Sequence, residues 1–395
     1  MAMKRSSARH IRTTHTGSLP RPQEIFDLVK AMTAGEKVDE KVYEAALERN
    51  VADYVKRQVE AGIDTVTDGE LSKPSFQAYI GERLGGFEAR IPPGGLPVPT
   101  GPMGVGGRDA ELFPDFYRLV LENNPFKHTI RAAPRVCVGP VRYIGHEKLQ
   151  RDIRNLKNAM AKAGADEGFM PALTPVPAMP NEHYKSEEDF VLAFGEAMRE
   201  EYKAILDAGL LLQIDFPRLI SNWDVDAKKM DLAGYRRRCA IMIEQLNHAL
   251  RGLPEDRIRF HTCYGVNFGP RVSDLQLEDF IDLIFTIKAG AYSFEAANPR
   301  HDHEWRVMER VKLPAGKILI PGAVTHSNVM IEHPELVADR MERWANVVGR
   351  ENVIFGNDCG FQSTAGNTEI PITVAWAKLQ ALGEGARVAA KRAAH

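Results

Sequence analysis

Two cysteines, a histidine and a glutamate stand near the ends of strand-like segments and have the chemistry of one zinc site. His261 and Cys263 belong to RFHTCYG, Glu295 to YSFEAAN and Cys359 to FGNDCG. Side chains alternate between the two faces of a strand, so His261 and Cys263 point the same way. Imidazole, thiolate and carboxylate groups are zinc ligands, and a carboxylate beside two thiolates is one that an incoming thiol could displace. The four residues therefore predict a zinc site that activates thiols.

The pair formed by His261 and Cys263 also has a purely structural explanation, since buried free cysteine is common in protein cores. Glu295 and Cys359, each at the end of its own strand-like run, favour the metal interpretation. A non-catalytic zinc protein is a further alternative. Structural zinc is normally enclosed by permanent ligands, however, and a displaceable glutamate argues for catalysis.

The elements that must position these residues alternate regularly along the chain. Short runs rich in Val, Ile and Phe are separated by longer stretches of helical periodicity, which is typical of βα units around a parallel sheet. The pattern predicts an α/β fold, a (β/α)8 TIM barrel with a polar N-terminal arm, and residues 1–395 suit a single such barrel. The eight strands are expected at His10–Ser18, Asp64–Asp68, Met170–Val176, Leu211–Asp215, Arg257–Cys263, Ala291–Ala296, Ile318–Ala323 and Asn352–Asn357. The helices are expected at Lys41–Glu60, Ser186–Ala208, Leu232–Leu253, Leu277–Lys288, Pro334–Val348 and Thr373–Ala394.

Residues 83–145 interrupt the repeat. Phe87–Ile91 and Ala132–Tyr143 also resemble strands, and the long segment PPGGLPVPTGPMGVGG lies between them. A loop of this length in a compact domain is usually functional or mobile, so we predict an inserted antiparallel hairpin bordering the active-site mouth. A disordered surface excursion is the alternative. A doubly wound sheet is disfavoured, because no glycine-rich phosphate loop follows the first strand.

Polar side chains gather at the expected strand ends, where barrel enzymes carry their active sites. Asn298 follows the sixth predicted strand and Asp358 the eighth. The segment NPRHDHEW adds Arg300, His301 and His303. The two histidines could form a rival metal site, or one could carry a proton. We expect instead that this segment contacts the substrate or supports the zinc ligands.

Composition limits the possible partners. The chain has 395 residues, of which 44% are hydrophobic and 26% charged, with a net charge of −2. These values are ordinary for a soluble globular protein and lack the basic surface that nucleic acid or an anionic membrane requires. No apolar run approaches the roughly 20 residues of a membrane span, and no apolar stretch follows MAMKRSSARH. Four dispersed cysteines are too few for a disulfide scaffold. We expect a cytoplasmic enzyme whose partners are small molecules, and the sequence does not fix its oligomeric state.

Five motifs, THTGSLPRP, TDGE, QIDFP, HTCYG and FGNDCG, together resemble the C-terminal catalytic barrel of the cobalamin-independent methionine synthases over most of the chain. The resemblance implies that zinc is held by the four residues named above, in the same order. It also implies that Ser18, Glu70 and Asp215 bind the amino acid part of homocysteine, since carboxylates suit an ammonium group. Taken singly, each of these three residues could instead stabilise a turn or a helix end.

The chain resembles the short branch of this family. The long synthases carry two barrels, and this chain has room for one. The short branch includes core synthases that take methyl groups from a corrinoid donor and epoxyalkane:coenzyme M transferases. The tryptophan that the long enzymes place beside folate has no counterpart in ALTPVPAMP, so the donor stays open.

We expect zinc-dependent transfer of a methyl (alkyl) group to a thiol such as homocysteine, through a zinc-bound thiolate and SN2 attack. Coordination matters because a free thiol with a pKa of about 8.5 is little ionised at neutral pH. A general acid such as Asp358 or His301 would protonate the leaving group. The alternative function is a zinc-dependent epoxide-opening thiol transferase or lyase, whose sulfonate thiol would require cations such as Arg300 or Arg21.

Overall fold

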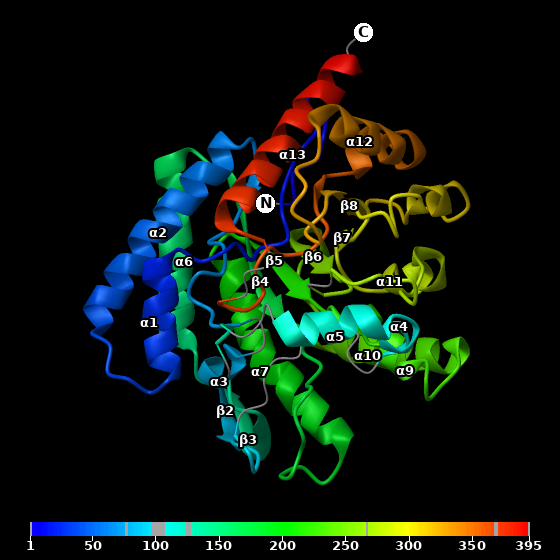
Figure 1. Ribbon diagram of the computed structural model, residues 1–395. Helices are drawn as coiled ribbons and strands as arrows, with labels where there is room; N and C mark the ends of the chain where they lie inside the picture. Colours follow the sequence, from blue (N-terminus) through cyan, green and yellow to red (C-terminus); the bar gives the residue numbers. More distant parts are fainter. Residues whose placement is uncertain are drawn as a thin grey trace.

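Seven parallel strands form one curved sheet with helices packed around it (Figure 1). The structure, a computed structural model, describes residues 2–75, 78–95, 107–123, 128–130, 132–265, 268–366 and 370–393. The strand order is β1-β4-β5-β6-β7-β8-β9, and every neighbouring pair is parallel. The strands are β1 Thr65–Val66, β4 Glu167–Leu173, β5 Leu211–Asp215, β6 Ile258–His261, β7 Ala291–Phe294, β8 Ile318–Val324 and β9 Gly356–Asn357.

The segment expected as the first strand closes this sheet into a ring. Thr13 bridges Phe355, directly before β9, and Thr14 bridges Thr65 at the start of β1. The Thr14 N–H donates to the Phe355 carbonyl at 2.8 Å, and the Thr65 N–H donates to the Thr13 carbonyl at 3.1 Å. Both edges of the sheet therefore meet the same two residues. The barrel prediction is confirmed, with the first strand reduced to single bridges.

Several other strands differ in extent from their predictions: β1, β6 and β7 are shorter than expected, and two further strands differ for local reasons. The strand expected at Met170–Val176 runs from Glu167 to Leu173, and it ends before Pro175, which has no N–H to donate to a ladder. The strand expected at Asn352–Asn357 is reduced to Gly356–Asn357, because residues 350–352 form a 3-10 turn.

The long helices lie outside the sheet, and α2, α7 and α10 begin at side chains that cap them. The Asp39 carboxylate accepts the Lys41 N–H at the start of α2, and the Ser186 hydroxyl accepts the Asp189 N–H at the start of α7. These caps satisfy N–H groups that the first turn leaves without intrahelical partners. The helices of the main repeat are α1 Gln23–Thr33, α2 Glu40–Glu60, α6 His146–Ala163, α7 Glu187–Asp207, α8 Arg218–Ser221, α9 Trp223–Asp226, α10 Leu232–Ala249, α11 Ile281–Ile284, α12 Pro334–Val348 and α13 Ile372–Arg392. The 3-10 helices are η1 Glu255–Arg257, η2 Leu277–Asp279, η3 Glu304–Glu309 and η4 Arg350–Asn352.

The single helix expected over Leu277–Lys288 is wrong. A 3-10 turn, η2, is followed by the short α11, and Phe280 between them has φ −143°, outside the helical range. The expected closing helix is confirmed as α13, although Ala394 lies outside the described residues.

The inserted hairpin is confirmed. Strand β2, Leu84–Ala89, pairs antiparallel with β3, Arg135–Tyr143. The connection contains α4, Arg108–Leu112, and α5, Pro114–Asn123, while residues 96–106 of the predicted loop lie outside the described part of the chain. A further short helix, α3, Ile80–Arg83, precedes β2. In Figure 1, α4 lies beside α9, well away from the hairpin.

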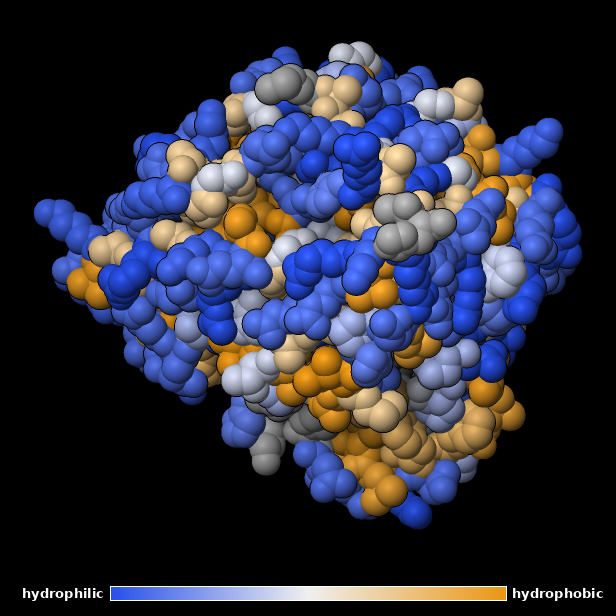
Figure 2. Space-filling view, turned by 90° about the horizontal axis from the view of Figure 1, so that it is seen from above, coloured by the Kyte–Doolittle hydropathy of each residue, from blue (hydrophilic) through white to orange (hydrophobic). Residues whose placement is uncertain are grey.

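The polar N-terminal arm crosses the end of the barrel where the strands begin. Met3 packs with residues that line the strand starts, and its N–H donates to the Asp256 carbonyl at 2.9 Å. Within the described ranges, no helix has the length and apolar character needed to cross a membrane. The face in Figure 2 is mainly hydrophilic, with apolar side chains gathered at its lower edge.

Candidate metal centre

His261, Cys263 and Cys359 meet at the end of the barrel where the strands finish. His261 ends β6, Cys263 lies two residues later, and Cys359 lies two residues after β9. Their ligand atoms are within 4.8 Å of one another, and all three side chains are buried. The two sulfur atoms are 3.0 Å apart. Strands β6 and β9 are not neighbours, so the curvature of the barrel brings these residues together.

The His261 ring presents one nitrogen to the two thiols. Its Nδ1 lies 3.1 Å from the Ser293 hydroxyl, whereas its buried Nε2 has no hydrogen-bond partner among the residues that the structure describes. Burial lowers the pKa of His261 to about 3, assisted by the nearby charges of Arg259 and His326. A neutral imidazole with a free nitrogen, fixed through its other nitrogen, is the form that binds metal ions.

The two thiols also require a positive partner. The hydrogen bond with Cys263, followed by burial, raises the pKa of Cys359 well above its ordinary value. Two touching buried thiols lose their protons readily only beside a cation. An orphaned imidazole nitrogen and two sulfur atoms are a soft donor set that suits a metal such as zinc. The residues present therefore fit the predicted ion.

Glu295, the fourth predicted ligand, lies beside this group and is held by other residues. The Tyr264 N–H donates to Oε1 at 2.9 Å, Asn298 Nδ2 donates to Oε2 at 2.9 Å, and Arg271 Nη2 forms an ion pair with Oε2 at 2.8 Å. Its charge contributes, after Cys263 and burial, to the raised pKa of Cys359. The structure thus unites three predicted ligands and keeps the fourth carboxylate alongside them.

Asp358 and Asn298 fix the turn that carries Glu295. Asp358 Oδ1 accepts the N–H groups of Ala296 and Ala297 at 2.7 and 2.8 Å. Asn298 Nδ2 lies 3.3 Å from the other Asp358 oxygen. Both predicted residues therefore lie at the site, but their polar atoms are engaged with the protein.

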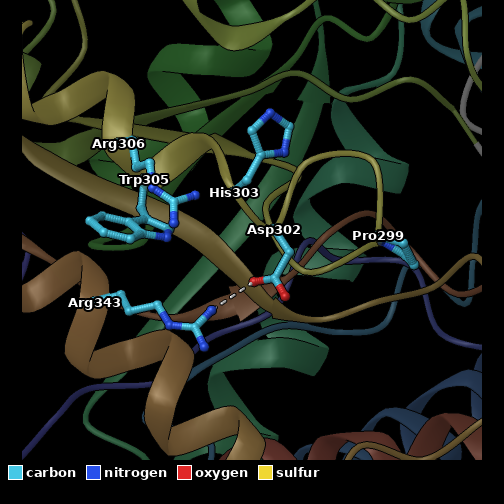
Figure 3. Close-up of a pocket in the computed structure, with 6 residues that line it drawn as sticks. All are labelled: Pro299, Asp302, His303, Trp305, Arg306 and Arg343. Carbon is cyan, nitrogen blue, oxygen red and sulfur yellow. Dashed lines mark ion pairs between the residues drawn. The ribbon is translucent and has the colours of Figure 1, made fainter.

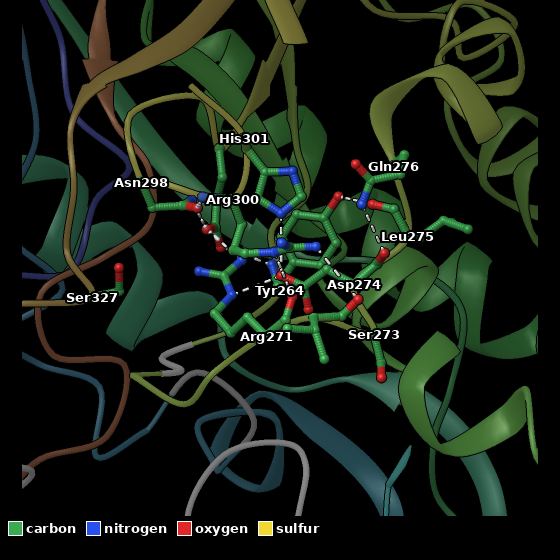
Figure 4. Close-up of polar contacts among 12 residues, drawn as sticks. Tyr264, Arg271, Ser273, Asp274, Leu275, Gln276, Asn298, Arg300, His301 and Ser327 are labelled. Carbon is green, nitrogen blue, oxygen red and sulfur yellow. Dashed lines mark hydrogen bonds and ion pairs between the residues drawn. The ribbon is translucent and has the colours of Figure 1, made fainter. Parts of the chain in front are cut away.

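His301 and Arg300 belong to a buried polar cluster shown in Figure 4. His301 Nε2 lies 3.1 Å from Asp274 and its Nδ1 lies 2.8 Å from Glu304. Burial alone would lower the pKa of His301, but these two hydrogen bonds outweigh it and raise the pKa to about 9. Arg300 Nε donates to the Arg271 carbonyl at 3.1 Å. Both side chains are occupied by protein groups and support the loop around Arg271.

Ser18, Glu70 and Asp215 lie together near the cysteines. Ser18 is buried against Gly360, where any added Cβ would collide with its hydroxyl. Burial, followed by repulsion from Glu70, raises the pKa of Asp215 well above its ordinary value, so the two carboxylates are close. Glu70 also forms an ion pair with Lys73 at 3.3 Å.

His326 is a site residue that the sequence interpretation missed. It is buried, and its ligand nitrogen lies within 4.8 Å of the carboxylates of Glu295 and Asp358. Its Nε2 lies 3.0 Å from the Gly265 carbonyl, and its Nδ1 is without a partner in the described parts of the chain. The available signal was its place two residues after β8, at the same end of the barrel as the predicted ligands. Arg271 and Lys73 stand in loops, and nothing in their spacing indicated a role.

A separate depression of about 410 Å³ lies on the outside of the barrel (Figure 3). Its lining includes Trp305, Arg306 and Arg343, and Arg343 pairs with Asp302 at 3.7 Å. His303, named in the sequence analysis, lines this depression and so lies apart from the metal centre, none of whose residues line it.

Comparison with known proteins supports the resemblance inferred from the sequence motifs. Residues 11–93 match the family model described as "Cobalamin-independent synthase, Catalytic domain". A methionine synthase from Thermococcus kodakarensis is 23% identical over 358 residues, covering 89% of this chain and 86% of that protein. One from Saccharolobus islandicus is 24% identical over 382 residues, covering 95% and 94%. The chain is therefore similar to the cobalamin-independent methionine synthases over most of its length. The resemblance inferred from the five motifs is confirmed.

Solved structures of the family share the barrel. The B12-independent methionine synthase from Shewanella sp. W3-18-1, solved in complex with selenomethionine, superposes with a TM-score of 0.69 at 21% identity, covering 97% of this chain and 98% of the other. A putative vitamin-B12 independent methionine synthase from Listeria monocytogenes gives a TM-score of 0.63 at 17% identity, with 98% of both chains covered. At these identities the likeness establishes the fold of this chain.

Proposed function

We propose that this methyltransferase transfers a methyl group to the sulfur of a small thiol such as homocysteine, with zinc as its cofactor. The observation that carries the proposal is the meeting of a ring nitrogen of His261 with the two sulfur atoms of Cys263 and Cys359, while the buried Nε2 of His261 has no partner among the described residues. Glu295 is the proposed fourth ligand. Zinc, when bound, lowers the pKa of a coordinated thiol, so that the nucleophilic thiolate exists at neutral pH.

Ser18, Glu70 and Asp215 are proposed to bind the amino acid part of the thiol. Repulsion from Glu70 and burial disfavour the charged form of Asp215, and an arriving ammonium group relieves both effects. The substrate's amino group would thus add a positive partner to carboxylates that already interact with Lys73 and Gln213. Gln213 Nε2 donates to Asp215 Oδ1 at 2.7 Å and fixes the direction of that carboxylate.

His326 is proposed to carry the proton that methyl transfer requires. The thiol loses a proton before attack, the new S–C bond forms as the bond to the donor breaks, and the leaving group takes up a proton. One ring nitrogen of His326 lies within 4.8 Å of the carboxylates of Glu295 and Asp358, its Nδ1 has no partner among the described residues, and the side chain is only 1% exposed, which excludes bulk water. Asp358 and His301, expected as acids, are proposed to position this site, since their polar atoms are engaged elsewhere.

The contacts favour homocysteine over a sulfonate thiol. The alternative function, an epoxide-opening transferase, requires free cations, and Arg21 and Arg300 were its candidates. Arg21 Nη2 donates to the carbonyls of Glu70 and Lys73, and Arg300 Nε donates to the carbonyl of Arg271. Both guanidinium groups are thus used to hold loops. We propose a small-molecule thiol and a methyl donor as the partners, in the cytoplasm.

Zinc content and thiol binding test the proposal. We expect one zinc ion per chain in the anaerobically purified wild type, and homocysteine binding by titration calorimetry with release of a proton. Cys359→Ser should lower the zinc affinity by more than about 100-fold, since it removes a ligand rather than a supporting contact. Cys239→Ser is the matched control, because Cys239 lies in α10 and donates to the Leu219 carbonyl.

Two results would contradict the proposal. If the wild-type protein lacks zinc after anaerobic purification, the assignment of a metal centre is wrong. Zinc-loaded protein that binds coenzyme M in preference to homocysteine would transfer the assignment to the epoxide-opening class.

A further inference from the structure

The Glu295 carboxylate has a complete set of partners besides any metal ion. Its Oε1 accepts the Tyr264 N–H at 2.9 Å, and its Oε2 accepts Asn298 Nδ2 at 2.9 Å. Arg271 Nη2 lies 2.8 Å from Oε2 and supplies a positive charge. The side chains of Glu295 and Arg271 are both buried, so this ion pair is shielded from water. A carboxylate held in this way is stable without a metal contact.

The position of Arg271 is itself fixed by a chain of contacts. Arg271 Nε donates to Asp274 Oδ2 at 2.7 Å, and Asp274 lies 3.1 Å from His301 (Figure 4). His301 in turn lies 2.8 Å from Glu304. The guanidinium also lies over the Tyr264 ring, 5.0 Å from its centre. The Arg271 backbone has φ +60°, a left-handed conformation that non-glycine residues adopt rarely. The loop therefore maintains an unfavourable backbone while it places this guanidinium on Glu295.

We propose that Arg271 is the positioning residue that receives Glu295 when a substrate thiol takes the place of this carboxylate among the metal ligands. The inference rests on the proposed function. A buried carboxylate that leaves a cation is costly unless another cation accepts it. Arg271 provides that cation at a distance already suited to an ion pair. It acts through Glu295 and does not itself touch the reacting atoms.

The role of Arg271 has an unusual consequence for metal affinity. Its guanidinium and the metal compete for one carboxylate, so loss of the guanidinium frees Glu295 to bind the metal more firmly. Thiol binding, which must displace Glu295, then becomes weaker. Loss of an ordinary structural residue would instead weaken both kinds of binding. Opposite changes in the two affinities are therefore diagnostic.

The test compares Arg271→Met with wild type for zinc affinity, by competition with a chromophoric chelator, and for homocysteine affinity, by titration calorimetry of the zinc-loaded protein. We expect zinc to bind more tightly and homocysteine to bind about tenfold more weakly, the scale of contacts that support metal ligands. Arg271→Lys keeps the charge and should recover part of the homocysteine affinity. Arg271→Lys also takes the place of Arg271→Met as the test variant if the methionine variant does not fold. Arg310→Met is the matched control, since Arg310 is exposed and pairs with Glu278.

A double-mutant cycle with Glu295→Ala shows whether Arg271 acts through this carboxylate. In that background, Arg271→Met should leave the homocysteine affinity unchanged. Affinities for zinc and homocysteine that stay within twofold of wild type in Arg271→Met, or an equal loss in the Glu295→Ala background, would overturn the inference. If the wild type binds zinc but not homocysteine, the proposed function fails, while the zinc affinity of Arg271→Met still decides the role of Arg271.

Discussion

His261 and His301 are both buried in this barrel, yet their pKa values move in opposite directions. Burial dominates at His261, where a serine hydroxyl is the hydrogen-bond partner, and lowers its pKa to about 3. At His301 two carboxylates outweigh burial and raise the pKa to about 9. The first histidine is therefore neutral, as a metal ligand must be, and the second is an imidazolium that joins Asp274 to Glu304. Burial decides the charge of His261, whereas two carboxylates override burial at His301.

The raised pKa of His301 makes stability depend on pH. Its folded pKa of about 9 exceeds the ordinary value of 6.5, so its contribution is fully present below pH 6.5 and is lost as the pH rises through 9. The contribution is at most about 3 kcal/mol at low pH. We expect the urea concentration at the unfolding midpoint of the wild type to decrease as the pH rises from 6.5 to 9. The midpoint of His301→Gln should change much less over the same range. Equal slopes for the two proteins would contradict this prediction.

The sequence predicted the donor atoms of the site better than the contacts that control them. Alternation along the expected strand placed His261 and Cys263 on one face, although β6 ends at His261 and Cys263 lies just beyond it. The pairing of Glu295 with Arg271 joins two loops, and no local periodicity reports such a contact. His326 was missed because a lone histidine after a strand looks ordinary until its neighbours in space are known.

At the scale of elements, one aspartate attaches the insertion to the barrel. Asp224 in α9 accepts the backbone N–H groups of Arg108 and Asp109, the first residues of α4, at 2.9 and 3.2 Å. Asp109 in turn accepts the Ser273 N–H at 2.9 Å. Helix α4 is thereby linked to the loop that carries Arg271 and Asp274. The sequence predicted the hairpin from its apolar runs, but this attachment depends on side chains more than 100 residues apart.

Asp224→Ala should release α4 while leaving the barrel folded. Loss of a capping side chain costs about 1 kcal/mol, and here it removes the acceptor of two N–H groups. We expect faster amide hydrogen exchange in residues 108–112, measured by mass spectrometry, with little change in β4 to β8. The matched control is Asp282→Ala, which removes an exposed partner of Arg236. Unchanged exchange in α4 would show that other contacts hold it.

The prediction of a single helix at Leu277–Lys288 is wrong because of a contact between elements. Its apolar residues recur with helical spacing, and Leu277, Ile281 and Ile284 are indeed buried. The Leu277 N–H, however, donates to Glu304 Oε1 at 2.7 Å, and Phe280 leaves the helical conformation. A tertiary contact therefore overrides a local preference.

At the scale of the whole molecule, the barrel was predictable because its strands and helices alternate over most of the chain. Its closure was predicted only in part. A full strand was expected at His10–Ser18, but only Thr13 and Thr14 form bridges, with Phe355 and Thr65 from distant parts of the sequence. The extent of this pairing depends on those neighbours, which local sequence patterns do not report.

Met3 covers the end of the barrel where the strands begin, opposite to the candidate metal centre. Replacing Met3 should destabilise the whole fold. Met3 is 7% exposed and packs on residues that line the strand starts, among them Phe169 and Leu211. Met3→Ala leaves a cavity there and should lower the free energy of unfolding by about 2 kcal/mol. Met32→Ala is the control, since Met32 is 37% exposed on α1 and should change stability little. Urea unfolding measures both variants. Because the metal centre lies at the other end of the barrel, the zinc affinity of Met3→Ala should match wild type, and a parallel loss of zinc would mean that the two ends are coupled.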